Sequence, residues 1–185
     1  MRFSLRTALI AIGILSIVFV VGERQSRDRR TRQRLINEIA SFGGSDPTID
    51  ESYAVSWITI EDRITARLPD RFSVLESLYC SDSNVSDADL RYLESAQEIL
   101  VLHLDGTRIT DDGLHHLAKI ESLNAIRFNG TAISDAGINS LATVNFKLGV
   151  DLSGTRVTQA GVDRLKEQRP EIYVIHRDLG LDGYE

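Results

Sequence analysis

The sequence predicts an α/β fold in which short strands and helices alternate as stacked repeats, an arrangement called a β/α solenoid. A similar sequence motif occurs four times, and each copy begins 24 residues after the previous one. A fixed period of this size is typical of solenoids, in which each repeat packs mainly against its neighbours. The hydrophobic fraction of 42% is ordinary for a globular protein and allows a continuous core. The four copies occupy residues 75–93, 99–117, 123–141 and 147–165.

An uncharged apolar run occupies residues 7–22 and predicts a membrane anchor. As a helix this run spans about 24 Å, against about 30 Å of hydrocarbon in a bilayer. Arg6 and Arg24 can extend their charged ends to the headgroups, so that residues 5–23 contact the lipid bilayer. We therefore expect a single-pass anchor over residues 1–23 and a location at the cell membrane. A cleavable signal peptide and a buried helix are the alternatives, but the run has no A-x-A cleavage site.

A basic segment follows the run, and residues 24–44 are expected to form a juxtamembrane helix that ends at Gly43 and Gly44. This segment holds six arginines, whereas two arginines precede the apolar run. The positive-inside rule therefore favours a cytoplasmic repeat domain. Most bacterial N-terminal anchors keep the amino end inside, however, which is the opposite orientation.

The charge of the chain argues against nucleic acid as a partner. Residues 1–34 carry eight arginines and two acidic residues, whereas residues 35–185 carry 13 basic and 25 acidic residues. A main domain with a net charge of −12 repels a phosphate backbone. No aromatic residues interleave with the arginines for base stacking, so the basic segment is better explained as a topology signal or a contact with anionic lipid.

Residues 45–73 are expected to form a cap over the first repeat, which would otherwise expose its apolar face. Strand-forming residues fill positions 53–60, and a short helix is expected at 64–68. An Asp-Pro pair at 46–47 indicates a turn ahead of this strand. The aromatic residues of this region are expected to pack in the cap rather than bind a ligand; they are Phe42, Trp57 and Phe72.

Each repeat, within residues 74–176, has the pattern of a strand followed by a helix. In the second copy Leu102 and Leu104 point to one side of a short strand. Thr110 is placed as a helix N-cap, and Leu114 and Leu117 lie one helical turn apart, facing the strand. The equivalent apolar positions of all four copies are expected to form the core. A fifth, incomplete coil supplies a last strand, and residues 177–185 form a tail.

Small polar residues form one further column, Ser83, Thr107, Thr131 and Thr155. We expect their hydroxyls to bond backbone groups of the adjacent coil. Cys80 is the only cysteine and takes a leucine position in the pattern, which predicts a buried, inert thiol and excludes an internal disulfide.

Together the columns read L-x-x-L-x-L-x-x-T-x-I-[TS]-D-x-G-[LI]-x-x-L and resemble the leucine-rich repeat family. The likeness is greatest to the bacterial T-D-x-G-L subtype, to its small membrane-anchored members and to the repeats of F-box adaptor proteins. No F-box precedes the repeats. The resemblance implies a right-handed β/α solenoid with a concave face of parallel strands, and protein binding rather than catalysis. Asp89 replaces the repeat glycine in copy one and Gln159 the repeat aspartate in copy four, in terminal copies where atypical residues are expected.

The candidate binding residues are the outward positions of successive strands, which lie about 4.8 Å apart in a sheet. Tyrosine and arginine are enriched at protein interfaces, so we expect a protein or peptide partner there. The alternative is a solvated face with an ion pair between Arg127 and Asp151 on adjacent strands. The candidates are Tyr79, His103, Arg127 and Asp151 in one row, with Asp105 and Asn129 beside it.

The sequence therefore predicts a non-catalytic, membrane-tethered protein that binds other proteins through this face. Self-association as a structural component of the cell envelope is the first alternative. A small hydrolase or metal-dependent enzyme is the second, because His103 lies near Asp105. No Ser or Cys nucleophile accompanies this pair with a base, and the adjacent His115 and His116 lack metal-ligand spacing. We expect no catalytic residue, metal or cofactor.

Overall fold

The computed structural model describes residues 29–41, 43–49, 55–66, 75–94, 96 and 99–177. The chain divides into two units, Met1–Glu38 and Ile39–Glu185. The described residues of the first unit are helical, and the helical conformation continues to residue 41. Gly43 follows with a φ of +95° and donates its N–H to the carbonyl of Ala40 at 3.1 Å, a turn that glycine adopts easily at a helix end.

The predicted membrane anchor at residues 1–23 lies outside the described residues. Within the described residues, no helix has both the length and the apolar composition needed to cross a bilayer.

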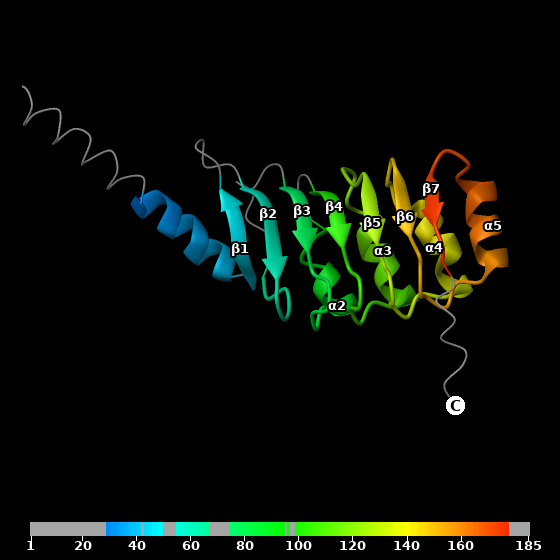
Figure 1. The fold of residues 1–185 in the computed structure, drawn as a ribbon, viewed down its shortest axis with the longest axis horizontal. Helices are drawn as coiled ribbons and strands as arrows, with labels where there is room; N and C mark the ends of the chain where they lie inside the picture. Colours follow the sequence, from blue (N-terminus) through cyan, green and yellow to red (C-terminus); the bar gives the residue numbers. More distant parts are fainter. Residues whose placement is uncertain are drawn as a thin grey trace, which may run out of the picture. The chain divides into compact units, whose positions relative to one another are not determined.

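The second unit is built on a seven-stranded sheet in which each strand pairs with the next one in the sequence (Figure 1). Strands β1 and β2 are antiparallel, and every later pair is parallel. Equivalent residues of successive copies pair in phase, for example Leu78 with Leu102 and Leu102 with Ile126. The strands are β1 (Gly44–Ile49), β2 (Val55–Ile60), β3 (Leu75–Tyr79), β4 (Ile99–His103), β5 (Ala125–Arg127), β6 (Gly149–Asp151) and β7 (Tyr173–Ile175).

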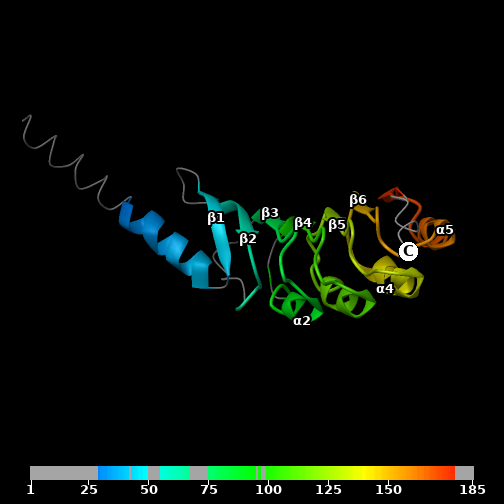
Figure 2. The same cartoon turned by 60° about the horizontal axis from the view of Figure 1, so that its bottom comes forward.

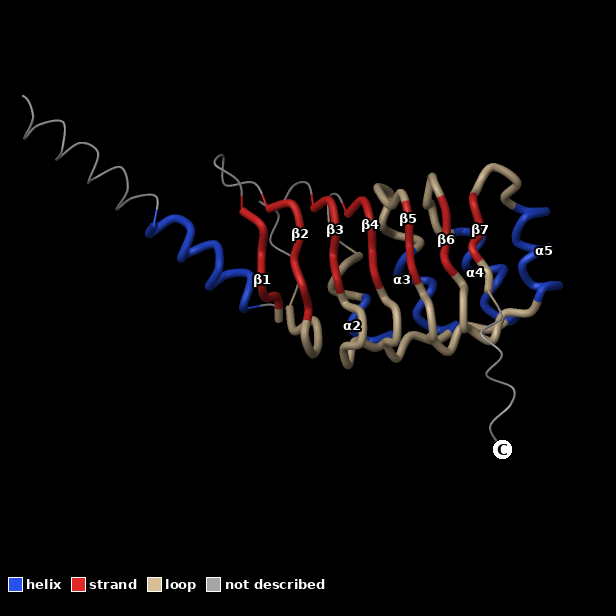
Figure 3. The backbone as a smooth tube through the Cα atoms, viewed as in Figure 1, coloured by secondary structure: helices blue, strands red, loops and turns tan. Residues whose placement is uncertain are grey.

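Short helices alternate with the parallel strands β3 to β7 and lie on one side of them (Figures 2 and 3). They are α2 (Asp87–Leu90), η1 (Asp111–Gly113), α3 (Leu114–Leu117), η2 (Asp135–Gly137), α4 (Ile138–Thr143) and α5 (Gln159–Gln168). In the second copy Thr110 caps the helical segment as predicted, since its hydroxyl accepts the N–H of Asp112 at 3.2 Å. The predicted α/β class is thus confirmed, with strands and helices in alternation.

The predicted apolar columns form the core between the strands and the helices. All of them are at most 4% exposed: Leu78, Cys80, Val85, Leu90, Leu93, Leu102, Leu104, Ile109, Leu114, Leu117, Ile126, Phe128, Ile133, Ile138, Leu141, Val150, Leu152, Val157, Val162 and Leu165. The fourth copy departs at its first position, where Lys147 is exposed and Phe146, one residue earlier, is buried. Leu148, which lies in the same column as Glu76, Leu100 and Asn124, is 64% exposed.

The cap differs from the prediction in two places. Residues 44–49 form a strand rather than a turn, since Pro47 is tolerated on an edge strand beside the register shifts between Ser45 and Thr48. Described residues 64–66 form no helix, contrary to the expectation for 64–68. Phe42 and Phe72 lie outside the described residues, and Trp57 is described only by its backbone pairing, to Thr48 on one side and Ser77 on the other.

The small polar column also differs from the prediction. Each hydroxyl donates to the carbonyl three residues earlier in its own coil, at 2.6–2.7 Å, rather than to the adjacent coil. In the second copy, for example, Thr107 bonds the carbonyl of Leu104. These residues therefore close the bend after each strand, where Gly106 has a φ of +65°.

Candidate functional site

The outward side chains of the parallel strands form a row on the sheet face opposite the helices. Tyr79 pairs in register with His103, His103 with Arg127, and Arg127 with Asp151. We call these four residues the outward row. Within the second unit the described helices lie on the other side of strands β3 to β7 (Figure 2), and the side chains of Tyr79 and Arg127 are exposed.

The first half of the outward row is a ring stack. The rings of Tyr79 and His103 lie 4.2 Å apart between centroids and are inclined by only 9°. Partial burial lowers the pKa of His103, and the nearby charge of Arg127 lowers it further, while Asp105 opposes both. The imidazole is therefore neutral at pH 7, which suits a flat contact surface better than a charged one.

The second half of the row differs from the ion pair that the alternative interpretation of this face expected. Arg127 does not pair with Asp151; its Nε atom lies 3.1 Å from Oδ2 of Asp105. Asp105 is positioned by a second bond, because its Oδ1 accepts the backbone N–H of Asn129 at 2.9 Å. Asp151 is instead turned to its own coil, where Oδ1 accepts the N–H of Ser153 at 3.0 Å. Sequence spacing alone could not choose between two carboxylates that both lie next to Arg127.

A hollow of about 560 Å³ lies on the same face, beside the outward row and toward the last strands. The flanking positions of three successive strands lose side-chain volume, from Val101 through Ala125 to Gly149. Leu148 and Tyr173 also line this hollow, and they are 64% and 71% exposed. The hollow was not predicted from the sequence. The available signal was the loss of side-chain volume at one flanking position of successive copies, from Val101 through Ala125 to Gly149.

The repeated acidic residues on the helix side have a structural role. Each accepts two hydrogen bonds from the helix-capping residue of the next copy, one from its N–H and one from its hydroxyl, at 2.6–2.9 Å. A Cβ atom on the repeat glycine of the next copy would lie 2.1–2.3 Å from the same carboxylate, so glycine is required there. We call these contacts the aspartate junctions: Asp87 with Thr110 and Gly113, Asp111 with Ser134 and Gly137, and Asp135 with Thr158 and Gly161.

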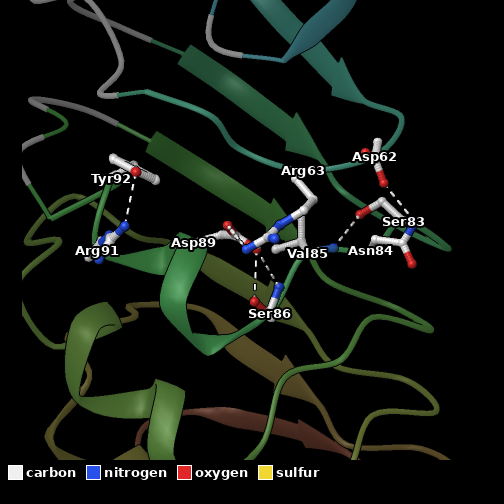
Figure 4. Close-up of polar contacts among 9 residues, drawn as sticks. All are labelled: Asp62, Arg63, Ser83, Asn84, Val85, Ser86, Asp89, Arg91 and Tyr92. Carbon is white, nitrogen blue, oxygen red and sulfur yellow. Dashed lines mark hydrogen bonds and ion pairs between the residues drawn. The ribbon is translucent and has the colours of Figure 1, made fainter.

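In the first junction an arginine stands where the later junctions have the preceding aspartate, and an aspartate stands where they have the glycine (Figure 4). Arg63 stands 24 residues before Asp87, and Asp89 stands 24 residues before Gly113. The guanidinium of Arg63 bonds both carboxylate oxygens of Asp89, at 2.9 and 3.3 Å. Asp89 also accepts the N–H and the hydroxyl of Ser86, the bonds that a preceding aspartate supplies in later copies.

Asp89 remains charged although it is only 2% exposed. Burial by itself would raise the pKa of Asp89, but the bonds from Arg63 and Ser86 outweigh it and hold the pKa below its usual value. The substitution of the repeat glycine by Asp89 is therefore compensated by Arg63. Gln159 is the first residue of α5, the last helix of the described chain. No described helix follows whose capping residue would donate to an aspartate at this position, and Gln159 instead donates to Asp163 at 2.8 Å.

Other reactive side chains of the described residues have structural surroundings. Burial raises the pKa of Cys80 far above neutrality, so its thiol stays protonated. His116 and Lys119 both bond Glu94, at 2.5 and 2.7 Å, and form an ion-pair cluster on the helix side. No group of three or more metal-ligating side chains comes together in the part of the chain that the structure describes.

No protein-family model matches this sequence, and no curated protein matches it. Membership of the leucine-rich repeat family therefore stays a prediction from the residues.

Proposed function

We propose that this chain is a membrane-tethered leucine-rich repeat protein that binds other proteins through the outward face of its parallel strands. The observation that carries the proposal is the outward row, in which an aromatic ring, an imidazole, a guanidinium and a carboxylate occupy neighbouring strands on an uncovered face. Tyrosine and arginine are enriched at the residues that dominate protein interfaces; here a ring stack holds Tyr79 and an ion pair holds Arg127.

The right-handed solenoid is part of this proposal. It is supported by the in-phase pairing of copies 24 residues apart and by the aspartate junctions, which join each helix start to the next copy. In a solenoid each copy contacts mainly its neighbours, so this kind of contact must recur at every boundary.

Attachment to the membrane through residues 5–23 is also proposed, on the strength of their uncharged apolar sequence. Protease treatment of sealed membranes that contain a tagged full-length chain tests both attachment and orientation. A cytoplasmic repeat domain, which the positive-inside rule favours, is protected in right-side-out vesicles and is digested in inverted ones. Release of the chain by carbonate washing would contradict an anchor.

The binding role is tested by placing a photo-crosslinking amino acid at Tyr79 of the full-length chain in its own cells, with the same residue at Lys166 as the control. Lys166 is exposed on α5, on the helix side. We expect Tyr79 to yield a specific protein adduct that Lys166 does not yield. The purified partner should then bind the variant with Tyr79→Ala and Arg127→Ala at least about tenfold more weakly.

Self-association is the second candidate, because β7, like β1 at the other end, is an edge strand of the sheet in the described chain. Edge strands offer unpaired backbone groups to a second copy. Sedimentation of the full-length chain in detergent separates the candidates: a strict monomer at high concentration counts against self-association.

A further inference from the structure

The hollow beside the outward row has the shape of a site for an inserted side chain. Its floor is made by Val101, Ala125 and Gly149, whose side chains become smaller in that order across three neighbouring strands. Gly149 cannot be enlarged, because a Cβ atom there would lie 2.3 Å from the carbonyl oxygen of Tyr173. Position 149 therefore has to lack a side chain, which leaves space above it. The hollow has a volume of about 560 Å³, enough for more than one side chain.

The walls of the hollow are apolar and exposed. Leu148 is 64% exposed and Tyr173 is 71% exposed. Nearly all other large hydrophobic side chains among the described residues are covered; the further exceptions are Ile36 in the first unit and Tyr79 in the outward row. Covering Leu148 and Tyr173 would remove apolar area from water, which favours a partner with an apolar side chain.

The rim of the hollow is positive in an otherwise acidic unit. Arg127, Arg177 and Asp151 are its charged lining residues, whereas residues 35–185 together carry a net charge of −12. Arg127 uses its Nε atom for Asp105, and its two terminal nitrogens bond no described residue. The guanidinium of Arg177 likewise has no partner among the described side chains. Both arginines can therefore donate hydrogen bonds to a carboxylate of a ligand.

We propose that the hollow binds an extended peptide segment of a protein partner, with a leucine or aromatic anchor followed two to four residues later by an acidic side chain. This inference rests on the proposed function and states the chemistry of its partner. The spacing comes from the strands: Arg127 lies two residues beyond Ala125, and Arg177 lies four beyond Tyr173. At about 3.3 Å per residue these steps are about 7 and 13 Å, the reach of two to four extended residues.

The first test selects binders from a phage-displayed library of random heptapeptides on the full-length chain in nanodiscs. We expect enriched sequences to carry leucine, phenylalanine, tyrosine or tryptophan with aspartate or glutamate two to four positions later. A synthetic copy of an enriched peptide should lose at least about tenfold in affinity when its anchor becomes alanine or its acids become amides. Enrichment without this pattern, or no enrichment, would overturn the proposal.

The second test uses variants whose side chains are already exposed, so that the fold is retained. Leu148→Ser combined with Tyr173→Ser should weaken the selected peptide at least about tenfold, and Arg177→Glu should weaken the acidic peptide more than its amide copy. Lys166→Glu on α5 is the matched charge control and should leave affinity unchanged. Equal affinity for the native chain and the Leu148–Tyr173 double variant would overturn the proposal.

The outcomes separate this inference from the proposed function. Tyr79 does not line the hollow. A cross-linked protein partner that is lost with Tyr79→Ala but binds the Leu148–Tyr173 double variant normally would leave the proposed function standing and reject the hollow. If the native chain forms a dimer and the double variant is a monomer, the hollow is occupied by a second copy. Tighter peptide binding after removal of residues 178–185 would assign it to that segment, and either result would overturn the proposal.

Discussion

The two sides of the repeated unit use their polar residues in different ways. On the helix side the same contact recurs at each interior boundary, with an aspartate, a Ser or Thr hydroxyl and a glycine in fixed positions. On the strand side the outward row carries a different residue in each copy, from Tyr79 to Asp151. The repeated residues of the aspartate junctions maintain the stack of copies. The outward row has no such repeated contact, so its residues can differ to suit a partner. The most memorable motif of the sequence is thus the one least informative about function.

The first junction departs from the recurrent contact, but its capping residue still donates two hydrogen bonds to a carboxylate. Ser86 donates two bonds to Asp89 of its own copy, whereas Thr110 donates two bonds to Asp87 of the preceding copy. Arg63 then occupies the position of the preceding aspartate and neutralises Asp89. What each boundary requires is a carboxylate that accepts from the capping residue, and the chain meets that requirement in two ways.

The largest effect is expected when the first junction is converted to the interior type. Asp89→Gly alone should lower the free energy of unfolding by about 3 kcal/mol, because the N–H and the hydroxyl of Ser86 both lose their acceptor, Oδ2 of Asp89, and a glycine enters a helix. Adding Arg63→Asp places a carboxylate 24 residues before Asp87 and should restore about half of that loss. Urea denaturation of the full-length chain in detergent measures both. No recovery in the double variant would contradict the equivalence of the two junctions.

The next largest effect is expected at an interior junction. Gly137→Ala places a Cβ atom 2.3 Å from Oδ1 of Asp111 and should cost about 2 kcal/mol. The same substitution should cost clearly less in an Asp111→Ala background, where the carboxylate is gone and only the flexible end of Leu114, at 2.9 Å, still obstructs the Cβ atom; Asp111→Ala by itself also destabilises the fold. A double-mutant cycle from denaturation curves checks this coupling. Additive costs would mean that the glycine serves some purpose other than room for Asp111.

A smaller effect concerns the dependence of stability on pH. The pKa values of Asp89 and Asp135 are lowered in the folded state, Asp135 chiefly by its bonds from Thr158. A lowered pKa means that the unfolded chain binds the proton more readily. The stabilisation is therefore present above the unfolded pKa of aspartate, near 4, and is lost as the pH falls through the folded value. Denaturation at pH 7 and pH 3 should show this loss, and Asp89→Asn should reduce it more than Asp112→Asn, whose side chain is exposed.

The smallest effects on stability are expected on the strand side. Arg127→Ala removes an ion pair whose arginine is half exposed, and it should change the free energy of unfolding by less than about 1 kcal/mol. Tyr79→Ala removes a ring stack that contributes about 1 kcal/mol. A loss of several kcal/mol in either variant would show that the outward row maintains the fold, and the contrast between the two sides would fail.

The periodicity of the sequence was sufficient to predict the strand order, the phase of the pairing and the buried columns, because a fixed period leaves one consistent way to stack the copies. It could not assign the ion pair of Arg127, since the choice between Asp105 and Asp151 depends on side-chain reach and local turns. It also could not show that Asp89 is matched by Arg63, because Arg63 lies outside the recognisable copies.

The hollow lay beyond sequence reasoning for a related reason. It depends on which side chains meet near the end of the sheet, where the exposed Leu148 and Tyr173 line the same hollow as the small residue Gly149. The cap was predicted least well, because its residues follow no period and Pro47 within an edge strand reads as a turn.

We infer that the strand side binds a partner, while the helix side keeps the copies stacked. Isothermal titration of the cross-linked partner into the full-length chain tests it, with Tyr79→Ala plus Arg127→Ala compared with Arg164→Ala plus Lys166→Ala on α5. We predict that the strand-side pair loses at least about tenfold in affinity and the helix-side pair loses none. Equal affinity in the two double variants, with the fold intact in both, would contradict the claim.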